Sequence, residues 1–178
     1  MADRSGTGGK ITTLVLGGAR SGKSRYAETL IETLPPPWIY LATAEARDAE
    51  MEKRVAAHRA RRGKDWRTIE APNDLAGAIA NAPKESAVLI DCLTLWLSNR
   101  MLAGADVDQE IERLEAALKM HEGTIVLVSN EVGLGIVPDN ELARRFRDLQ
   151  GMLNQKLAVQ AARVVIMVAG LPIAVKSP

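Results

Sequence analysis

Residues 11–24 read Ile-Thr-Thr-Leu-Val-Leu-Gly-Gly-Ala-Arg-Ser-Gly-Lys-Ser, and this stretch predicts the fold. The apolar run over residues 11–16 is typical of a buried parallel strand. After the Gly-x-x-x-x-Gly-Lys-Ser run, residues 23–34 have the apolar spacing of a helix, which Pro35-Pro36-Pro37 ends. A strand, a glycine-rich turn and a helix in this order are characteristic of a phosphate-binding loop. We therefore predict that the protein binds a nucleoside triphosphate.

The residue types of this loop suit a triphosphate. Gly17 and Gly22 let the backbone turn successive N–H groups inward around a phosphate. These donors end at a helix N-terminus, where unpaired N–H groups and the helix dipole favour an anion. Lys23 can reach the β- and γ-phosphates, and the Ser24 hydroxyl can coordinate Mg²⁺. The predicted nucleotide-binding residues of the loop are Gly17, Gly18, Ala19, Arg20, Ser21, Gly22, Lys23 and Ser24.

Composition and charge argue against several functional classes. The chain has 178 residues, of which 47% are hydrophobic and 3% aromatic, and its formal net charge is +1. Near-neutral charge and scarce aromatic residues give no basis for nucleic-acid binding. No apolar run reaches the roughly 18 residues of a membrane span. The single cysteine, Cys92, suits a reducing compartment. We expect a cytoplasmic protein, with residues 1–10 as a flexible tail and residues 11–178 as a single P-loop nucleotide-binding catalytic domain.

Strands and helices alternate along the rest of the chain. We expect strands at 38–42, 66–70, 87–91, 124–129 and 163–169, and a short apolar segment at 173–175. We expect helices at 46–62, at 75–80 after a cap at Asn73 or Asp74, at 93–102, from Asp106 or Asp108 to His121, and from Pro138 past Leu157. The pattern predicts an α/β, P-loop NTPase-type three-layer fold, with a mostly parallel sheet and helices on both faces. Ligands of such sheets bind at the carboxyl ends of the strands, where Thr43, Asp91 and residues 129–131 fall.

Asp91 closes the apolar strand 87–91. In phosphate-loop enzymes, a carboxylate at the end of a second strand holds Mg²⁺, directly or through water. An acid that caps the following helix would look the same in the sequence. With the loop upstream, we favour Asp91 as a metal ligand together with Ser24. Cys92 has no basic residue close behind it and is predicted to be buried packing rather than a nucleophile.

The stretch from Asp48 to Arg62 is rich in arginine, and helical spacing places Arg54, His58, Arg61 and Arg62 on one face. One interpretation is a solvated helix whose end charges complement its dipole. The other is a phosphate-binding face, on which the neutral imidazole of His58 attacks phosphorus while the arginines stabilise charge and lower the pKa of His58. Spacing alone leaves both open. His121 is predicted to be only a cation at the end of another helix.

Two further acids could contact substrate hydroxyls. Glu70 ends a short strand, and Glu131 follows a buried strand in a loop that contains Gly133 and Gly135. Nothing in the sequence decides the role of either carboxylate, and the two glycines could equally be turn residues.

Taken together, these motifs resemble one family over nearly the whole chain from about Thr12. They are Gly17-Gly18-Ala19-Arg20-Ser21-Gly22-Lys23-Ser24, Tyr40-Leu41-Ala42-Thr43-Ala44, Asp48-x-Glu50-Met51-x-x-Arg54-x-x-x-His58-x-x-x-Arg62, Trp66-Arg67-Thr68-x-Glu70, Asp91-Cys92-Leu93-Thr94, Asn130-Glu131-Val132-Gly133-x-Gly135-Ile136-Val137-Pro138, Phe146-Arg147-Asp148 and Asn154-Gln155-x-Leu157-Ala158. The chain resembles the bifunctional adenosylcobinamide kinase / adenosylcobinamide-phosphate guanylyltransferase of cobalamin biosynthesis.

The resemblance implies a two-step reaction. The enzyme would phosphorylate the aminopropanol hydroxyl of adenosylcobinamide with ATP or GTP. It would then transfer GMP from GTP to that phosphate, which releases pyrophosphate and forms adenosylcobinamide-GDP. In the family the second step runs through a guanylylated histidine, and the matching residue is His58.

The resemblance also implies binding positions, a cofactor and an assembly. Beyond the loop, the implied GTP-binding residues are Ala42, Thr43, Ala44, Arg59, Ala60, Arg61, Arg62, Glu70 and Asp91. Mg²⁺ is the expected cofactor. A homo-oligomer, specifically a homotrimer, is implied, and the apolar helix 93–102 is a candidate interface whose pattern also fits the core.

Two other functions fit parts of the sequence. A monofunctional P-loop small-molecule kinase would need the loop and Asp91, and would leave His58 as an ordinary surface residue. A nucleotide-dependent switch or nucleic-acid-binding ATPase would use the arginine-rich helix as its contact surface. The near-neutral charge and missing aromatic residues weigh against this second alternative.

Overall fold

A seven-stranded sheet organises the part of the chain that the computed structural model describes, residues 12–45 and 62–177. The strands are β1 (Thr12–Gly17), β2 (Trp38–Ala42), β3 (Trp66–Glu70), β4 (Ala87–Asp91), β5 (Ile125–Val128), β6 (Arg163–Val168) and β7 (Leu171–Lys176). Their order is β3-β2-β4-β5-β1-β6-β7. All neighbouring strands pair in parallel except β7, which pairs antiparallel to β6. The predicted, mostly parallel sheet is confirmed.

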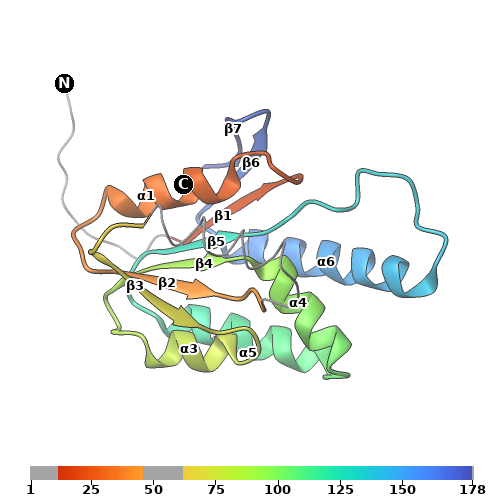
Figure 1. Ribbon diagram of the computed structural model, residues 1–178, viewed down its shortest axis with the longest axis horizontal. Coiled ribbons are helices and arrows are strands. Elements are labelled where there is room, and N and C mark those ends of the chain that lie inside the picture. Colours follow the sequence, from red (N-terminus) through yellow and green to blue (C-terminus); the bar gives the residue numbers. More distant parts are fainter. Residues whose placement is uncertain (1–11, 46–61, 178) are drawn as a thin grey trace.

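Helices cover both faces of this sheet. The described helices are α1 (Lys23–Glu32), α3 (Leu75–Asn81), α4 (Leu93–Leu102), α5 (Val107–Met120) and α6 (Glu141–Gln160). Helix α1 lies on one face, and α3, α4, α5 and α6 lie on the other (Figure 1). Among the described residues, no helix is both long and apolar enough to cross a membrane.

Each face of the sheet carries its own hydrophobic cluster. Successive side chains of a strand point to opposite faces, so Leu14 belongs to the cluster under α3–α6 and Val15 to the cluster under α1. On β4, Val88 and Leu89 divide in the same way. The central strands are buried on both faces, which explains why they read as continuous apolar runs. The two edge strands differ: β3 alternates apolar and polar residues, and all of β7 is exposed.

Side-chain caps set three of the helix starts. The Asp74 carboxylate accepts from Gly77 N at 3.0 Å, and the Asp106 carboxylate accepts from Gln109 N at 3.2 Å. These contacts decide the caps of α3 and α5 that the sequence left open. Helix α1 ends at Glu32, two residues before the predicted end.

The predicted start of the last helix is wrong. Helix α6 begins at Glu141 rather than at Pro138, because the Asn140 side chain caps it by accepting from Ala143 N at 2.8 Å. Residues 129–140 instead form a long connection that runs out beyond the ends of the strands before the chain turns back into α6 (Figure 1).

His121 was predicted only as a cation at the end of a helix. It follows the last turn of α5, but its ring is buried, and its Nε2 donates to the carbonyl of Ser86 at 2.9 Å. The ring therefore fastens the end of α5 to the turn before β4. The predicted helix 46–62 lies outside the described residues except for Arg62, which is in a bend.

Helix α4 belongs largely to the core. Leu93, Trp96 and Leu97 pack in the larger cluster, whereas Leu102 at the end of the helix is 56% exposed. The apolar pattern of this helix is therefore explained by burial within the chain.

We predict that Leu97→Ala lowers the free energy of unfolding by about 2–5 kcal/mol, because it opens a cavity in the core. Leu102→Ala, the same change on the same helix at an exposed position, should cost less than about 1 kcal/mol. Urea denaturation of both variants tests this, and equal costs would contradict the placement of α4.

Candidate functional site

The carboxyl ends of β3, β2 and β4 lie side by side. Ala42 on β2 is in register with Glu70 on β3 and with Asp91 on β4. On the other side of β4, the chain leaving β5 runs along the phosphate loop, where Glu131 N donates to Gly17 O at 3.0 Å. The fold therefore brings the loop and three predicted site residues to one edge of the sheet.

Two glycines of the loop are required by its geometry. Gly17 has φ +148°, and a Cβ there would lie 2.6 Å from the carbonyl oxygen of Met167 on β6. Gly22 has φ +95° and stands immediately before α1. A Cβ on Gly18 would meet nothing within 4 Å, so packing does not require that glycine. Ala19 and Arg20 are exposed between them.

Lys23 lies inside the turn of the loop. Its side chain is 7% exposed, and Nζ donates to the carbonyl of Gly18 at 2.6 Å and to Ser21 Oγ at 3.5 Å. Burial lowers the pKa of Lys23, and the charge of Asp91 acts in the opposite direction. The ammonium group and the Asp91 carboxylate therefore interact electrostatically across the site.

The helices that begin at this edge start differently from the others. Helices α3, α5 and α6 are capped by side chains, as described above. Helices α1 and α4 begin at Gly22 and Cys92 without a side-chain cap among the described residues. The first N–H groups of α1 are thus left for other acceptors, whereas at the start of α4 the N–H groups of Thr94 and Leu95 point to the Cys92 sulfur. Both helix starts carry the positive end of a helix dipole.

Thr43 fastens β2 to the end of β4. It is fully buried, and its Oγ1 accepts from Cys92 N and donates to Cys92 O, both at 2.7 Å. The Asn99 side-chain amide donates to Thr43 O and to Pro72 O, both at 3.0 Å. The Thr43 hydroxyl is therefore hydrogen-bonded to the backbone beside Asp91. Ala42 and Ala44 have no polar side chain, so they have only backbone groups to offer a ligand.

Tyr40 was not among the predicted site residues. Its hydroxyl donates to Asp91 Oδ2 at 3.1 Å, and the guanidinium carbon of Arg62 lies 3.5 Å from its ring centroid. Within the described residues, Arg62 Nε and Nη1 are buried and have no hydrogen-bond acceptor. The sequence feature that could have identified Tyr40 is the two-residue period of side chains along a strand, which places Tyr40 and Ala42 on the same face of β2.

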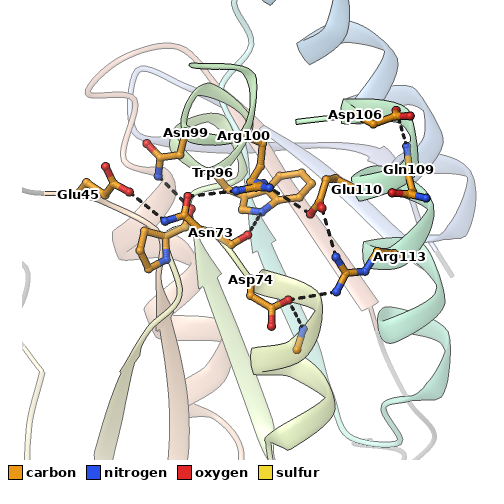
Figure 2. Close-up of polar contacts among 12 residues, drawn as sticks. Glu45, Asn73, Asp74, Trp96, Asn99, Arg100, Asp106, Gln109, Glu110 and Arg113 are labelled. Carbon is orange, nitrogen blue, oxygen red and sulfur yellow. Dashed lines mark hydrogen bonds and ion pairs between the residues drawn. The ribbon is translucent and has the colours of Figure 1, made fainter. Parts of the chain in front are cut away.

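The remaining predicted residues, His58, Arg59, Ala60 and Arg61, lie outside the described residues. Before that stretch, Glu45 Oε1 accepts from Asn73 Nδ2 at 3.2 Å, and Arg100 Nη1 donates to Asn73 Oδ1 at 3.4 Å (Figure 2). Trp96 Nε1 donates to the carbonyl of Asn73 at 3.1 Å. These contacts tie Glu45 to α4.

The polar contacts continue from Arg100 into the helices below. Arg100 Nε lies 3.6 Å from Glu110 Oε2, and Arg113 contacts both Glu110 and Asp74 (Figure 2). The network thereby joins Glu45 to α3 and α5, on the face of the sheet opposite α1.

Two oxygen donors at this edge suit Mg²⁺. The Ser24 hydroxyl is in the first turn of α1, and the Asp91 carboxylate is at the end of β4; both side chains are half-buried. No group of three or more His, Cys, Asp or Glu side chains that could hold a metal occurs among the described residues. Magnesium sites in nucleotide enzymes commonly use one or two protein oxygens with waters and phosphate oxygens, so this donor set fits the ion.

Cys92 beside Asp91 is not a nucleophile. It is buried, and burial raises its pKa to about 12, so the group is a neutral thiol at physiological pH. This agrees with the predicted packing role.

Comparison with known proteins identifies close relatives. The family model described as "Cobinamide kinase / cobinamide phosphate guanyltransferase" matches residues 13–175. A Pseudomonas aeruginosa protein named bifunctional adenosylcobalamin biosynthesis protein CobP is 49% identical over 166 residues, which cover 92% of this chain and 96% of that protein. The Salmonella typhimurium and Escherichia coli proteins named bifunctional adenosylcobalamin biosynthesis protein CobU are 41% and 40% identical, and each match covers 92% of this chain and 98% of the relative.

A solved structure shares the fold at low identity. It is described as a prototypical ATPase from the type III secretion system of pathogenic bacteria, and it aligns with a TM-score of 0.60 and 11% identity. The alignment covers 91% of this chain and 53% of that one. This likeness supports the predicted P-loop NTPase-type fold and carries no information on substrate.

We predict that Thr43→Val lowers the free energy of unfolding by about 2 kcal/mol, because it leaves the buried Cys92 N–H without an acceptor, while the Cys92 carbonyl keeps its hydrogen bond from Trp96 N. Thr43→Ser keeps the hydroxyl and should cost about 1 kcal/mol or less. Chemical denaturation of the two variants distinguishes them. A valine variant as stable as wild type would show that the hydroxyl does not matter.

Proposed function

This chain belongs to the cobinamide kinase / cobinamide phosphate guanyltransferase family, and on that premise we propose how its residues divide the two reactions between them. The protein is a bifunctional enzyme of cobalamin biosynthesis, with a kinase and a guanylyltransferase activity on the same chain. We propose that ATP or GTP phosphorylates adenosylcobinamide, and that GMP from GTP is then joined to the new phosphate with release of pyrophosphate.

The phosphate loop serves the kinase step. The loop residues Gly17–Ser24 would surround the triphosphate, with backbone N–H groups and the uncapped start of α1 facing its oxygens. The buried Lys23 ammonium would exchange the Gly18 carbonyl for β- and γ-phosphate oxygens. The substrate hydroxyl then attacks the γ-phosphorus, and the bond to the β-phosphate oxygen breaks. Phosphoryl transfer needs little beyond this positioning and charge stabilisation.

Ser24 and Asp91 would hold Mg²⁺. When bound, the ion neutralises charge on the phosphate oxygens. Asp91 already interacts with Lys23 and accepts a hydrogen bond from Tyr40, so its carboxylate is oriented by the protein itself.

We assign the guanylyl transfer to His58. Its imidazole would attack the α-phosphorus of GTP and release pyrophosphate, and an oxygen of the cobinamide phosphate would then displace histidine from the bound GMP. The observation that carries this assignment is the position of Arg62, four residues further along. It stacks on Tyr40 beside Asp91 and has two buried donors without an acceptor among the described residues.

The remaining assignments concern the rest of the nucleotide. We propose that Arg59, Ala60, Arg61 and Arg62 contact GTP with Glu70 and with the backbone of Ala42, Thr43 and Ala44. The register of β2 and β3, which sets Glu70 beside Ala42, supports this grouping. We place the reactions in the cytoplasm, where ATP and GTP are available; cell fractionation would check this.

A guanylylated histidine is directly testable. Wild-type protein incubated with GTP labelled at the α-phosphate should retain acid-labile, base-stable label after denaturation, because a phosphoramidate forms. His58→Ala should retain none, yet should phosphorylate adenosylcobinamide at a rate within about tenfold of wild type, since the kinase step does not use the imidazole.

The matched control is the other histidine of the chain. His121→Gln should keep the label, because His121 is buried against Ser86 and serves packing. An unlabelled wild type, or a labelled His58→Ala, would refute the assignment.

We also propose that the enzyme is a homotrimer. All six residues of the edge strand β7 are exposed, and they include Leu171, Ile173 and Val175. An exposed apolar edge strand is suited to association with another chain. It is therefore a better candidate interface than α4, whose apolar residues are mostly in the core.

Sedimentation velocity should give three times the monomer mass for wild type. Ile173→Lys should lower that mass, since a charge would be buried in the interface. Leu102→Lys, an equally polar change at the exposed end of α4, should leave it unchanged. A monomeric wild type would contradict the proposal.

A further inference from the structure

Tyr40 stands between a cation and a carboxylate. Its ring face contacts the Arg62 guanidinium at 3.5 Å, and its hydroxyl donates to Asp91 Oδ2 at 3.1 Å. We propose that Tyr40 is a positioning residue that holds Arg62 and Asp91 apart and aims each at the bound nucleotide, an inference that rests on the functions proposed above for those two residues.

The tyrosine ring has a fixed orientation. Tyr40 is 4% exposed and is paired on both sides, with Thr68 on β3 and Leu89 on β4. The Trp66 ring packs against it nearly edge-on, with centroids 6.2 Å apart and an interplanar angle of 79°. Trp66 is itself held by a hydrogen bond from Nε1 to Glu32 Oε1 at 3.1 Å. The ring face offered to Arg62 is therefore set before any ligand binds.

Stacking uses the face of the guanidinium and leaves its N–H edge available. The negative ring face attracts the cation without accepting any of its hydrogen bonds. In agreement with such stacking, Arg62 Nε and Nη1 are buried and have no hydrogen-bond acceptor among the described residues. Phosphate oxygens are acceptors that such an edge binds strongly.

The hydroxyl performs a second task on the other side of the ring. A phenol is protonated at physiological pH, so the buried Tyr40 hydroxyl acts as a donor to the carboxylate. The bond to Oδ2 orients the Asp91 carboxylate, and hydrogen bonds of this kind to metal ligands commonly tune metal affinity. Without the ring, the carboxylate and the guanidinium could pair directly, which would withdraw both from the nucleotide and its Mg²⁺.

Two substitutions separate the two tasks. Tyr40→Phe keeps the ring and removes the hydroxyl, whereas Tyr40→Leu removes both. Tyr26→Phe is the matched control, because it deletes a tyrosine hydroxyl whose side-chain partner among the described residues is Arg163, away from Asp91 and Arg62. Binding of a fluorescent GTP analogue is measured without metal and then as a function of Mg²⁺ concentration, which gives readouts independent of turnover.

We expect Tyr40→Phe to raise the half-saturating Mg²⁺ concentration about tenfold and to change metal-free nucleotide affinity less than about twofold. Tyr40→Leu should also weaken metal-free affinity, by about 5- to 30-fold, because the guanidinium loses its platform. Tyr26→Phe should change neither quantity. An unchanged Mg²⁺ dependence in Tyr40→Phe would overturn the proposal.

A double-mutant cycle tests the link to Arg62. Arg62→Ala should weaken metal-free nucleotide binding strongly in wild type, but less than about twofold in the Tyr40→Leu background, since the two residues act as a unit. Additive losses in variants with native circular dichroism would overturn the proposal. Such additivity is distinguishable from failure of the proposed function, which would appear as wild-type protein that binds GTP but forms neither product.

Discussion

The parallel register of β3, β2 and β4 is the constraint on which the site depends. Backbone hydrogen bonds set Glu70, Ala42 and Asp91 beside one another, and β5 then carries Glu131 alongside the loop that follows β1. A shift of one residue in any of these strands would send its side chains to the opposite face and separate the carboxylates from the loop. The two apolar clusters oppose such a shift in β2 and β4, which are buried on both faces, and pairing with β2 holds the edge strand β3 in register.

Backbone groups at the edge of this sheet are treated in two ways. Some are satisfied internally. The Thr43 hydroxyl bonds to the backbone of Cys92 at the end of β4, and the Asn99 side chain donates to Thr43 O. At the end of β5, the side chains of Ser129, Gln150 and Asn154 bond to one another, and Asn154 also donates to the carbonyl of Asn130. Others are left open, at the uncapped start of α1. The internally satisfied groups make the edge rigid, and the open ones would supply positive potential for anionic substrates. Under the proposed function, this one edge would serve both displacements at phosphorus, because both would use the same cradle.

The local sequence pattern predicted the strands well, and it predicted the start of α6 and the burial of His121 less well. Strands β2, β3 and β4 match their predicted bounds: β2 and β4 are apolar runs closed by a small or polar residue, and β3 alternates apolar and polar residues. The start of α6 was misplaced because Pro138 suits a first helical position, whereas the Asn140 cap competes better. His121 was predicted only as a cation at a helix end, and only tertiary packing shows that its ring is buried against the carbonyl of Ser86.

The sequence by itself determined the phosphate loop, the α/β class and the family, because these depend on residue types at fixed spacings within one short stretch or one motif. Only the tertiary structure decided the strand order, which inserts β5 between β1 and β4, and the partnership of Tyr40 with Arg62 and Asp91. Tyr40 reads in the sequence as one apolar residue of a buried strand. Its proposed role depends on contacts of its ring and its hydroxyl with two segments that are distant along the chain. The local spacing of residues does not reveal those contacts.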